Sequence, residues 1–248
     1  MLLWKFGGAM ADKVNPWDKL LPNQAFNSDQ YSGTLPLEQA LYEAVLWSSA
    51  IQTPKEHLKI EQSNLFSIEE MASNAAALGF VTWLLQLTKA RRVLEIGAFV
   101  GVSAMYFAKA LPADGRVVTI EKFDHFAAIA RRNFAANDLQ NKIDLVEGDA
   151  HEVLPTLLDR GPFDFAFIDG NKESYAEYFR LVEPMMSSNG VIAIDDAFFH
   201  GDALAAKPAS EKGRGVRAML ELSAGLKEWN RILLPLSNGL LLLVKKSF

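Results

Sequence analysis

The stretch Arg92-Val-Leu-Glu-Ile-Gly-Ala-Phe-Val-Gly-Val-Ser103 decides the fold. It begins as a short apolar run, passes through glycines at 97 and 101, and continues into the good helix-forming sequence that ends at Ala110. A strand, a glycine loop and a helix in this order form a ligand crevice at the carboxyl end of a central strand in open α/β sheets. Gly97 and Gly101 permit a tight turn and a close approach of backbone to a ligand.

The glycine spacing excludes two common nucleotide loops. It matches neither the phosphate-binding G-x-x-x-x-G-K-[ST] pattern nor the dinucleotide-binding G-x-G-x-x-G pattern. Glu95 lies just before the first glycine, where a carboxylate can face a cationic or hydroxyl-rich ligand. The identity of that ligand therefore depends on the rest of the chain.

Downstream of this stretch, apolar runs alternate with helical patterns. Such alternation indicates a parallel sheet that is covered by helices on both faces. Near the end, two apolar runs flank Ser237-Asn-Gly239, which is a strong hairpin signal. We therefore predict an α/β, Rossmann-like fold with a mostly parallel seven-stranded sheet and a C-terminal antiparallel β-hairpin, as in class I methyltransferases. Strands are expected at 92–96, 116–120, 142–146, 163–168 and 190–194, and helices at 102–111, 124–137, 150–159 and 173–186.

The first 90 residues have a different organisation. Residues 1–36 contain three prolines and several asparagines, so we expect an irregular arm. Residues 37–90 carry helical periodicity, and Ser67 and Glu70 have the spacing of a capping box. We treat 37–248 as a single methyltransferase domain, with N-terminal helices over 37–90 and an α/β core over 91–248.

Composition narrows the class of protein. The 248 residues include no cysteine, so disulfides and thiolate metal sites are excluded. The formal net charge of −5 lacks the basic character of a general nucleic-acid binder, so we expect no nucleic-acid partner. No apolar run reaches the roughly 20 residues of a membrane span, and no signal-peptide pattern begins the chain. We expect a cytoplasmic protein.

Acidic residues lie in the last residues of the predicted strands or just after them, at the edge where parallel strands all end. Concentrated carboxylates repel one another unless a cation is present, so a cationic ligand, a metal ion or both are implied. The acids are Glu95, Glu121, Asp149, Asp169, Asp195 and Asp196. Glu121 follows Gly101 by about 20 residues, an offset that suits a carboxylate on ribose hydroxyls.

Three of these acids are candidate metal ligands. Asp169, Asp195 and Asp196 come from neighbouring strand ends, and three hard oxygen ligands suit Mg²⁺, Mn²⁺ or Ca²⁺ better than Zn²⁺. A single aspartate in such a place is often only a helix cap, but three together favour a cation. Lys172 lies three residues past Asp169, and a nearby divalent cation would lower its pKa toward the range of a general base. The alternative for Lys172 is a solvated surface lysine.

Five motifs, in order and correctly spaced over roughly residues 65–246, resemble the cation-dependent O-methyltransferases. That family includes the caffeoyl-CoA and catechol O-methyltransferases. The motifs are Leu94-Glu-Ile-Gly-x-x-x-Gly-x-Ser103, Gly148-Asp-Ala150, Ile168-Asp-x-x-Lys-x-x-Tyr175, Gly190-Val-Ile-Ala-Ile-Asp-Asp196 and Leu234-Pro-Leu-x-x-Gly-Leu240.

The resemblance implies S-adenosylmethionine as methyl donor, a small hydroxylated molecule as acceptor, and a homodimer. It places Asp169 at both the metal and the donor, with Asp195 and Asp196 as further metal ligands and Lys172 as the base. Chemically, the metal lowers the pKa of the acceptor hydroxyl, and the lysine takes its proton. The residues implied at the donor are Met71, Ser73, Glu95, Gly97, Ser103, Glu121, Asp149, Ala150 and Asp169.

Two departures from the family pattern concern the acceptor side. Asp196 stands where the family usually has asparagine, which makes the predicted cation site more anionic. A long insert, Gly201 to Gly215, replaces a compact substrate loop. His200, just before it, is a candidate secondary acid or base, or a wall residue of the acceptor site.

Two other functions stay open at this point. One is methylation of a hydroxylated tRNA uridine by a relative in the same family, against which the acidic net charge argues. The other is a nicotinamide-dependent oxidoreductase, or a donor-binding protein without catalysis. The missing G-x-G-x-x-G pattern and the terminal hairpin argue against the oxidoreductase.

Overall fold

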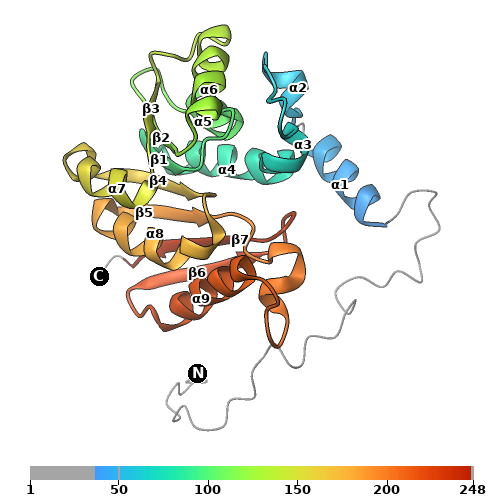
Figure 1. The fold of residues 1–248 in the computed structure, drawn as a ribbon, viewed down its shortest axis with the longest axis vertical. Helices are drawn as coiled ribbons and strands as arrows, with labels where there is room; N and C mark the ends of the chain where they lie inside the picture. The colour runs from blue at the N-terminus through green and yellow to red at the C-terminus, as the bar shows by residue number, and fades with distance from the viewer. Residues whose placement is uncertain (1–36, 50, 247–248) are drawn as a thin grey trace, which may run out of the picture.

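A seven-stranded sheet organises the protein (Figure 1). The structure is a computed structural model that describes residues 37–49 and 51–246; the predicted arm over 1–36 lies outside the described residues. The strand order is β3-β2-β1-β4-β5-β7-β6, with β1 to β5 parallel and β7 antiparallel to both of its neighbours. The mostly parallel seven-stranded sheet and its C-terminal antiparallel hairpin confirm the predicted fold class. The strands are β1 (Arg92–Ile96), β2 (Arg116–Glu121), β3 (Ile143–Glu147), β4 (Phe163–Ile168), β5 (Met186–Ile194), β6 (Trp229–Leu234) and β7 (Leu240–Lys245).

Helices cover both faces of the sheet. One apolar cluster joins the sheet to α4 (Ala75–Thr88), α5 (Val102–Ala110) and α6 (Asp124–Ala136). A second cluster joins the opposite face to α7 (Ala150–Val153), α8 (Tyr175–Val182) and α9 (Glu211–Gly225). Side chains of a strand alternate between faces, so Val93 packs in the first cluster while Leu94 and Ile96 pack in the second. The parallel core therefore buries both sides of β1.

The helices before the sheet bring a short segment to the carboxyl ends of the strands. They are α1 (Leu37–Ser48), α2 (Pro54–His57) and α3 (Ile68–Met71). The predicted capping box is confirmed, because Glu70 Oε2 accepts hydrogen bonds from the backbone and hydroxyl of Ser67, both at 2.9 Å. The box starts α3, and Ser73, between α3 and α4, contacts Asp169 directly after β4. Across residues 37–49 and 51–246, we find no helix with the length and apolar character that crossing a membrane requires.

Two predicted helices were too long, in both cases because of a proline. The helix predicted over 150–159 is α-helical only to Val153 and continues as a 3₁₀ helix, Leu154–Arg160, that contains Pro155. The helix predicted over 173–186 is α8, followed by a 3₁₀ turn containing Pro184, and β5 already begins at Met186. Proline lacks the N–H that an α-helix needs at these positions.

Candidate active site

The glycine loop after β1 packs directly against the end of β4. Gly97 has a φ of +97°, and a Cβ at this position would lie 2.4 Å from the carbonyl oxygen of Asp169. The backbone N–H of Asp169 donates to the carbonyl of Ile96 at 2.9 Å. Any side chain at 97 would therefore push apart the two strand ends that carry the candidate donor and metal residues.

Glu95 is a buried carboxylate with one free oxygen. Its Oε2 accepts a 2.5 Å hydrogen bond from Thr119, while its buried Oε1 accepts none within the described residues. Burial raises the pKa of the Glu95 carboxyl to about 7, against the opposing effect of the neighbouring hydroxyls of Ser103 and Thr119. A buried oxygen without a partner is costly, so Glu95 is suited to a ligand that brings a positive charge or a donor.

Glu121, at the end of β2, is held by the backbone. Its Oε2 accepts from the N–H of Phe99 at 2.7 Å, and its Oε1 accepts from the N–H of Phe123 at 2.9 Å. Burial nevertheless raises the pKa of Glu121. Each oxygen keeps a lone pair for a further donor, so the carboxylate can receive the two hydroxyls of a ribose.

The next strand end supplies Asp149, the N-cap of α7. Its Oδ1 accepts from the backbone N–H of His151 at 2.9 Å, and its Oδ2 pairs with Lys122 at 2.8 Å. The Lys122 ammonium holds the pKa of Asp149 well below its usual range. Ala150, the first residue of α7, is buried. Lys122 was missed by the sequence reasoning, although it directly follows Glu121.

On the other side of the crevice, two of the candidate metal ligands pair with the chain's own lysine. The Lys172 ammonium lies 2.5 Å from Asp169 Oδ1 and 2.9 Å from Asp196 Oδ2. Burial opposes the charge of Lys172, but these carboxylates outweigh it and hold the lysine pKa well above its ordinary value. In this arrangement Lys172 is a protonated counter-ion, which is the opposite of the depressed pKa expected beside a divalent cation.

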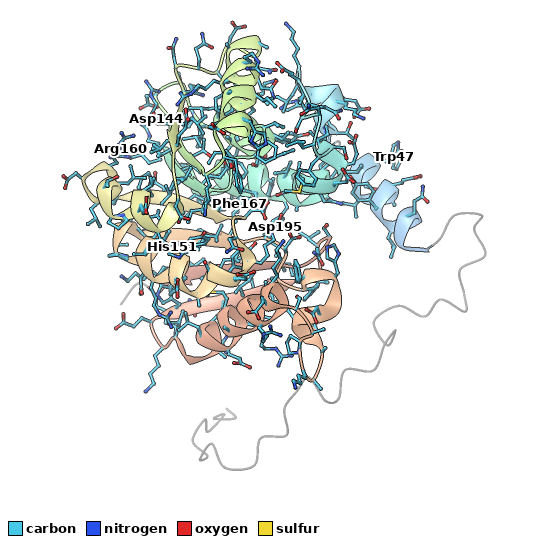
Figure 2. All side chains as sticks on the ribbon, in the orientation of Figure 1. Trp47, Asp144, His151, Arg160, Phe167 and Asp195 are labelled. Atoms are coloured by element: carbon cyan, nitrogen blue, oxygen red, sulfur yellow. The ribbon has the colours of Figure 1, made fainter. Side chains whose placement is uncertain are left out.

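The third carboxylate, Asp195, is almost fully buried, and Figure 2 labels it near the middle of the molecule. Burial first, and then repulsion from Asp169 and Asp196, raises its pKa to about 7. Ser73, assigned to the donor by resemblance, donates its hydroxyl to Asp169 Oδ2 at 3.2 Å. The Lys172 ammonium pairs with two of these three carboxylates, and the negative charge that remains fits an additional cation.

The oxygen donor set suits Mg²⁺, Mn²⁺ or Ca²⁺. Over residues 37–49 and 51–246, however, no three acidic or histidine side chains converge as a ready-made metal cage. Lys172 contacts two of the three aspartates instead. The residues present fit a cation that shares the carboxylates with the lysine, and the ligand set stays a prediction.

A cavity of about 530 Å³ opens over these carboxylates. It brings together His200, Met71 and Ser73 with Asp169, Asp195 and Asp196. His200 is an exposed wall residue, and Met71 is half-exposed at the end of α3. Asn238 also lines the cavity; the sequence reasoning assigned it only to the hairpin turn. The remaining lining residues come mainly from the N-terminal helices: Tyr42, Thr53, Pro54, Lys55, Ile68, Glu69, Glu70, Ala72, Asn74, Ala75 and Ser237.

A seven-stranded sheet with a terminal antiparallel pair, and acids aligned at its carboxyl edge, define the class of S-adenosylmethionine-dependent methyltransferases. The chain belongs to the O-methyltransferase family, whose model matches residues 48–246. The nicotinamide-dependent alternative is thereby wrong.

Individual relatives agree with this family. The chain is 34% identical to a catechol O-methyltransferase of Niastella koreensis, over 57% of this chain and 66% of the relative. It is 31% identical to a caffeoyl-CoA O-methyltransferase of Populus kitakamiensis, over 66% and 72%. Among solved structures, the O-methyltransferase from Bacillus cereus in complex with SAH has a TM-score of 0.68 at 26% identity, over 88% of this chain and 94% of that one. The protein is an S-adenosylmethionine-dependent O-methyltransferase of the caffeoyl-CoA and catechol type.

Proposed function

We propose that this enzyme requires a divalent cation and methylates a hydroxyl group of a small aromatic or natural-product acceptor. The observation that carries the proposal is the cavity over Asp169, Asp195 and Asp196, where three carboxylates face a space of about 530 Å³. That volume is in the range of small-molecule pockets. The relatives named for catechol and caffeoyl-CoA support an aromatic hydroxyl as acceptor.

The donor half of the crevice would hold S-adenosylmethionine, which carries the methyl group on a sulfonium sulfur. Glu95 would pair its free oxygen with the donor's ammonium, with Gly97 and Ser103 beside it, and Glu121 would bind the ribose hydroxyls. Asp149 and Ala150 would border the adenine. We keep Met71 and Ser73 as proposed donor contacts, although Ser73 also supports Asp169.

The acceptor half would place a hydroxyl oxygen near the three aspartates. A bound divalent cation would stabilise negative charge on that oxygen. Lys172 would lose part of the attraction that holds its proton if Asp169 and Asp196 also held a cation, and its pKa would then fall toward the range of a general base. Lys172 Nζ would then accept the hydroxyl proton, and His200 would act as a wall of the pocket or as a secondary acid or base.

Cation dependence is tested directly by chelation. Transfer of a methyl group to a catechol-like acceptor should disappear in EDTA and return with Mg²⁺ or Mn²⁺. Asp169→Ala should lower cation-supported turnover by about 10³-fold, because it removes a carboxylate that would serve both the cation and Lys172. Asp159→Ala, an exposed aspartate on the far 3₁₀ helix, is the matched control. Full activity of Asp169→Ala in chelator would rule out the cation role.

A further inference from the structure

The tip of the C-terminal hairpin lies on the loop that follows β5. Backbone N–H groups of Ala197 and Phe198 donate to the carbonyls of Gly239 and Asn238, at 2.9 Å and 2.7 Å. A Cβ on Gly239 would come within 2.7 Å of the Phe198 ring. The two segments, about 40 residues apart in sequence, therefore form one tightly packed unit at the edge of the acceptor cavity.

The Asn238 side chain joins this unit through both of its polar atoms. Its Nδ2 donates to Asp196 Oδ1 at 2.9 Å, and its Oδ1 accepts from the backbone N–H of His200 at 2.6 Å. A carboxylate accepts hydrogen bonds and an N–H donates them, so only one orientation of the amide satisfies both partners. Neither aspartate nor leucine at 238 could make both contacts.

The backbone of the turn does not explain this asparagine. The left-handed positions of the turn are Ser237, with a φ of +52°, and Gly239, with a φ of +91°. Asn238 lies between them and is not among the residues with positive φ. Its side-chain contacts, rather than turn geometry, therefore distinguish Asn238 from other residues at this position.

Asp196 needs such support, because its own backbone is unusual. It has a φ of +53°, a region that non-glycine residues rarely adopt. Its two oxygens are divided between partners: Oδ1 receives the Asn238 amide, and Oδ2 faces the Lys172 ammonium. The Asn238 amide thus fixes which oxygen of Asp196 faces Lys172.

We propose that Asn238 is a positioning residue for the methyl-transfer reaction: its amide orients the Asp196 carboxylate and holds the 196–200 loop against the hairpin. The inference rests on the proposed role of Asp196 at the cation. Asn238 acts through Asp196, so its effect should fall on cation affinity and turnover and leave the donor half of the crevice unchanged.

The test variant is Asn238→Asp, which keeps size and shape but replaces the donating NH₂ by a second carboxylate oxygen facing Asp196. We expect turnover to fall about 10- to 100-fold, the effect of losing a hydrogen bond to a charged group and adding repulsion. The dissociation constant for Mn²⁺ should change, whereas that for S-adenosylhomocysteine stays within about twofold of wild type. Asn141→Asp, an exposed asparagine at the opposite edge of the sheet, adds the same charge and is the control.

A reciprocal pair separates positioning from general damage. In the double variant Asp196→Asn with Asn238→Asp, the amide that donates the hydrogen bond and the carboxylate that accepts it exchange places. The hydrogen bond and the total charge are therefore both retained. This double variant should regain at least about tenfold of the turnover lost in Asn238→Asp, which is the coupling expected of groups in contact. The proposal would be overturned if the loss of turnover in the double variant were the product of the losses in the two single variants. Wild-type turnover in Asn238→Asp would also overturn it.

A readout without substrate distinguishes this proposal from the proposed function. Hydrogen exchange of amides 197–200 in the free protein should speed up in Asn238→Ala, while amides of β1 are unchanged. Unchanged exchange in this loop would overturn the positioning role, whatever the enzyme's activity. A different result would be faster exchange in Asn238→Ala together with wild-type activity that needs no cation. That result would overturn the proposed function and, with it, the role of Asn238 in the reaction. If Asn238→Asp weakened the binding of S-adenosylhomocysteine as much as it changed the binding of Mn²⁺, Asn238 would have only a structural role.

Discussion

The two halves of the crevice both bury carboxylates, but they stabilise them differently. On the donor half, Glu121 is held by backbone N–H groups of Phe99 and Phe123, which belong to the fold and cannot leave. On the acceptor half, Asp169 and Asp196 pair with the ammonium of one side chain, Lys172, beside hydrogen bonds from Ser73 and Asn238. The first arrangement is permanent, while the second can be exchanged for another cation.

This difference matches what each half must do. A donor site benefits from preorganised hydrogen bonds, because they need no rearrangement when the ligand binds. A site that removes a proton must let its base lose a proton and regain it during each turnover. Pairing Lys172 with carboxylates that a divalent cation can also use links the protonation of the base to the presence of the cation. Three variants can break or sharpen the comparison.

The largest effect on catalysis is expected when Lys172, the partner of Asp169 and Asp196 that a cation could replace, is removed. Lys172→Met should lower kcat about 10²- to 10⁴-fold, the usual contribution of a general base, while the affinity for S-adenosylhomocysteine stays near wild type. The same change leaves Asp169 and Asp196 without their ammonium, so Mn²⁺ should bind more tightly. Steady-state kinetics and calorimetry of Mn²⁺ binding measure the two effects.

Two further variants control this experiment. Lys172→Arg keeps the positive charge but cannot act as a base, so it should be as slow as Lys172→Met. Lys212→Met, on the exposed start of α9, should behave as wild type. Unchanged kcat in Lys172→Met would remove the lysine from the reaction, and weaker Mn²⁺ binding would contradict the exchange of counter-ions.

Changing Glu121, the carboxylate held by backbone N–H groups, should have a smaller effect, and that effect should fall on ligand affinity and not on kcat. Glu121→Gln turns one oxygen into an NH₂ that faces a backbone N–H, so the side chain can no longer accept on both sides. We expect S-adenosylhomocysteine to bind about 10- to 100-fold more weakly, with Mn²⁺ affinity unchanged. Glu147→Gln, the register neighbour on β3 that pairs with exposed Arg131, is the control. A loss of Mn²⁺ affinity in Glu121→Gln would show that the halves are not independent.

Local patterns were enough to predict the fold. The predicted starts of β1, β2 and β4 are the observed ones, because buried parallel strands are short apolar runs with sharp boundaries. The larger errors fell on two helices that contain Pro155 and Pro184, where the chain changes to a 3₁₀ turn, and on β5, which begins at Met186 and not at the predicted residue 190. Periodicity alone does not distinguish that turn from an α-helix, although the prolines themselves were a usable signal.

The site was predicted less completely, because its chemistry depends on contacts between distant segments. Parallel topology was enough to expect that Asp169, Asp195 and Asp196 would line one cavity. It gave no indication that Lys172 would be charged, since that follows from distances to Asp169 and Asp196. The hydrogen bond from Asn238 to Asp196 spans 42 residues, and the Asn-Gly pair was sufficiently explained by the turn.

The smallest expected effect concerns Glu95, the one donor-side carboxylate that the backbone leaves half satisfied. Burial raises its pKa from 4.5 to about 7, so the ligand-free protein holds a proton there that the unfolded chain has lost. Glu95 therefore makes the stability of the free protein fall as pH rises from about 4.5 to about 7, and then level off.

Ligand binding should have the opposite pH dependence. The donor's ammonium favours the ionised form of Glu95, so S-adenosylhomocysteine should bind up to about tenfold more tightly at pH 8 than at pH 6. Asp195 also has a pKa of about 7, so calorimetry in EDTA must compare Glu95→Gln with the wild type, because the titration of Asp195 is common to both proteins. Glu95→Gln has no proton to lose at residue 95, so its affinity should be weak and, apart from that common contribution, flat with pH. If the wild type were equally flat, Glu95 would already be ionised in the free protein, and both halves of the crevice would then hold their charges before any ligand arrives.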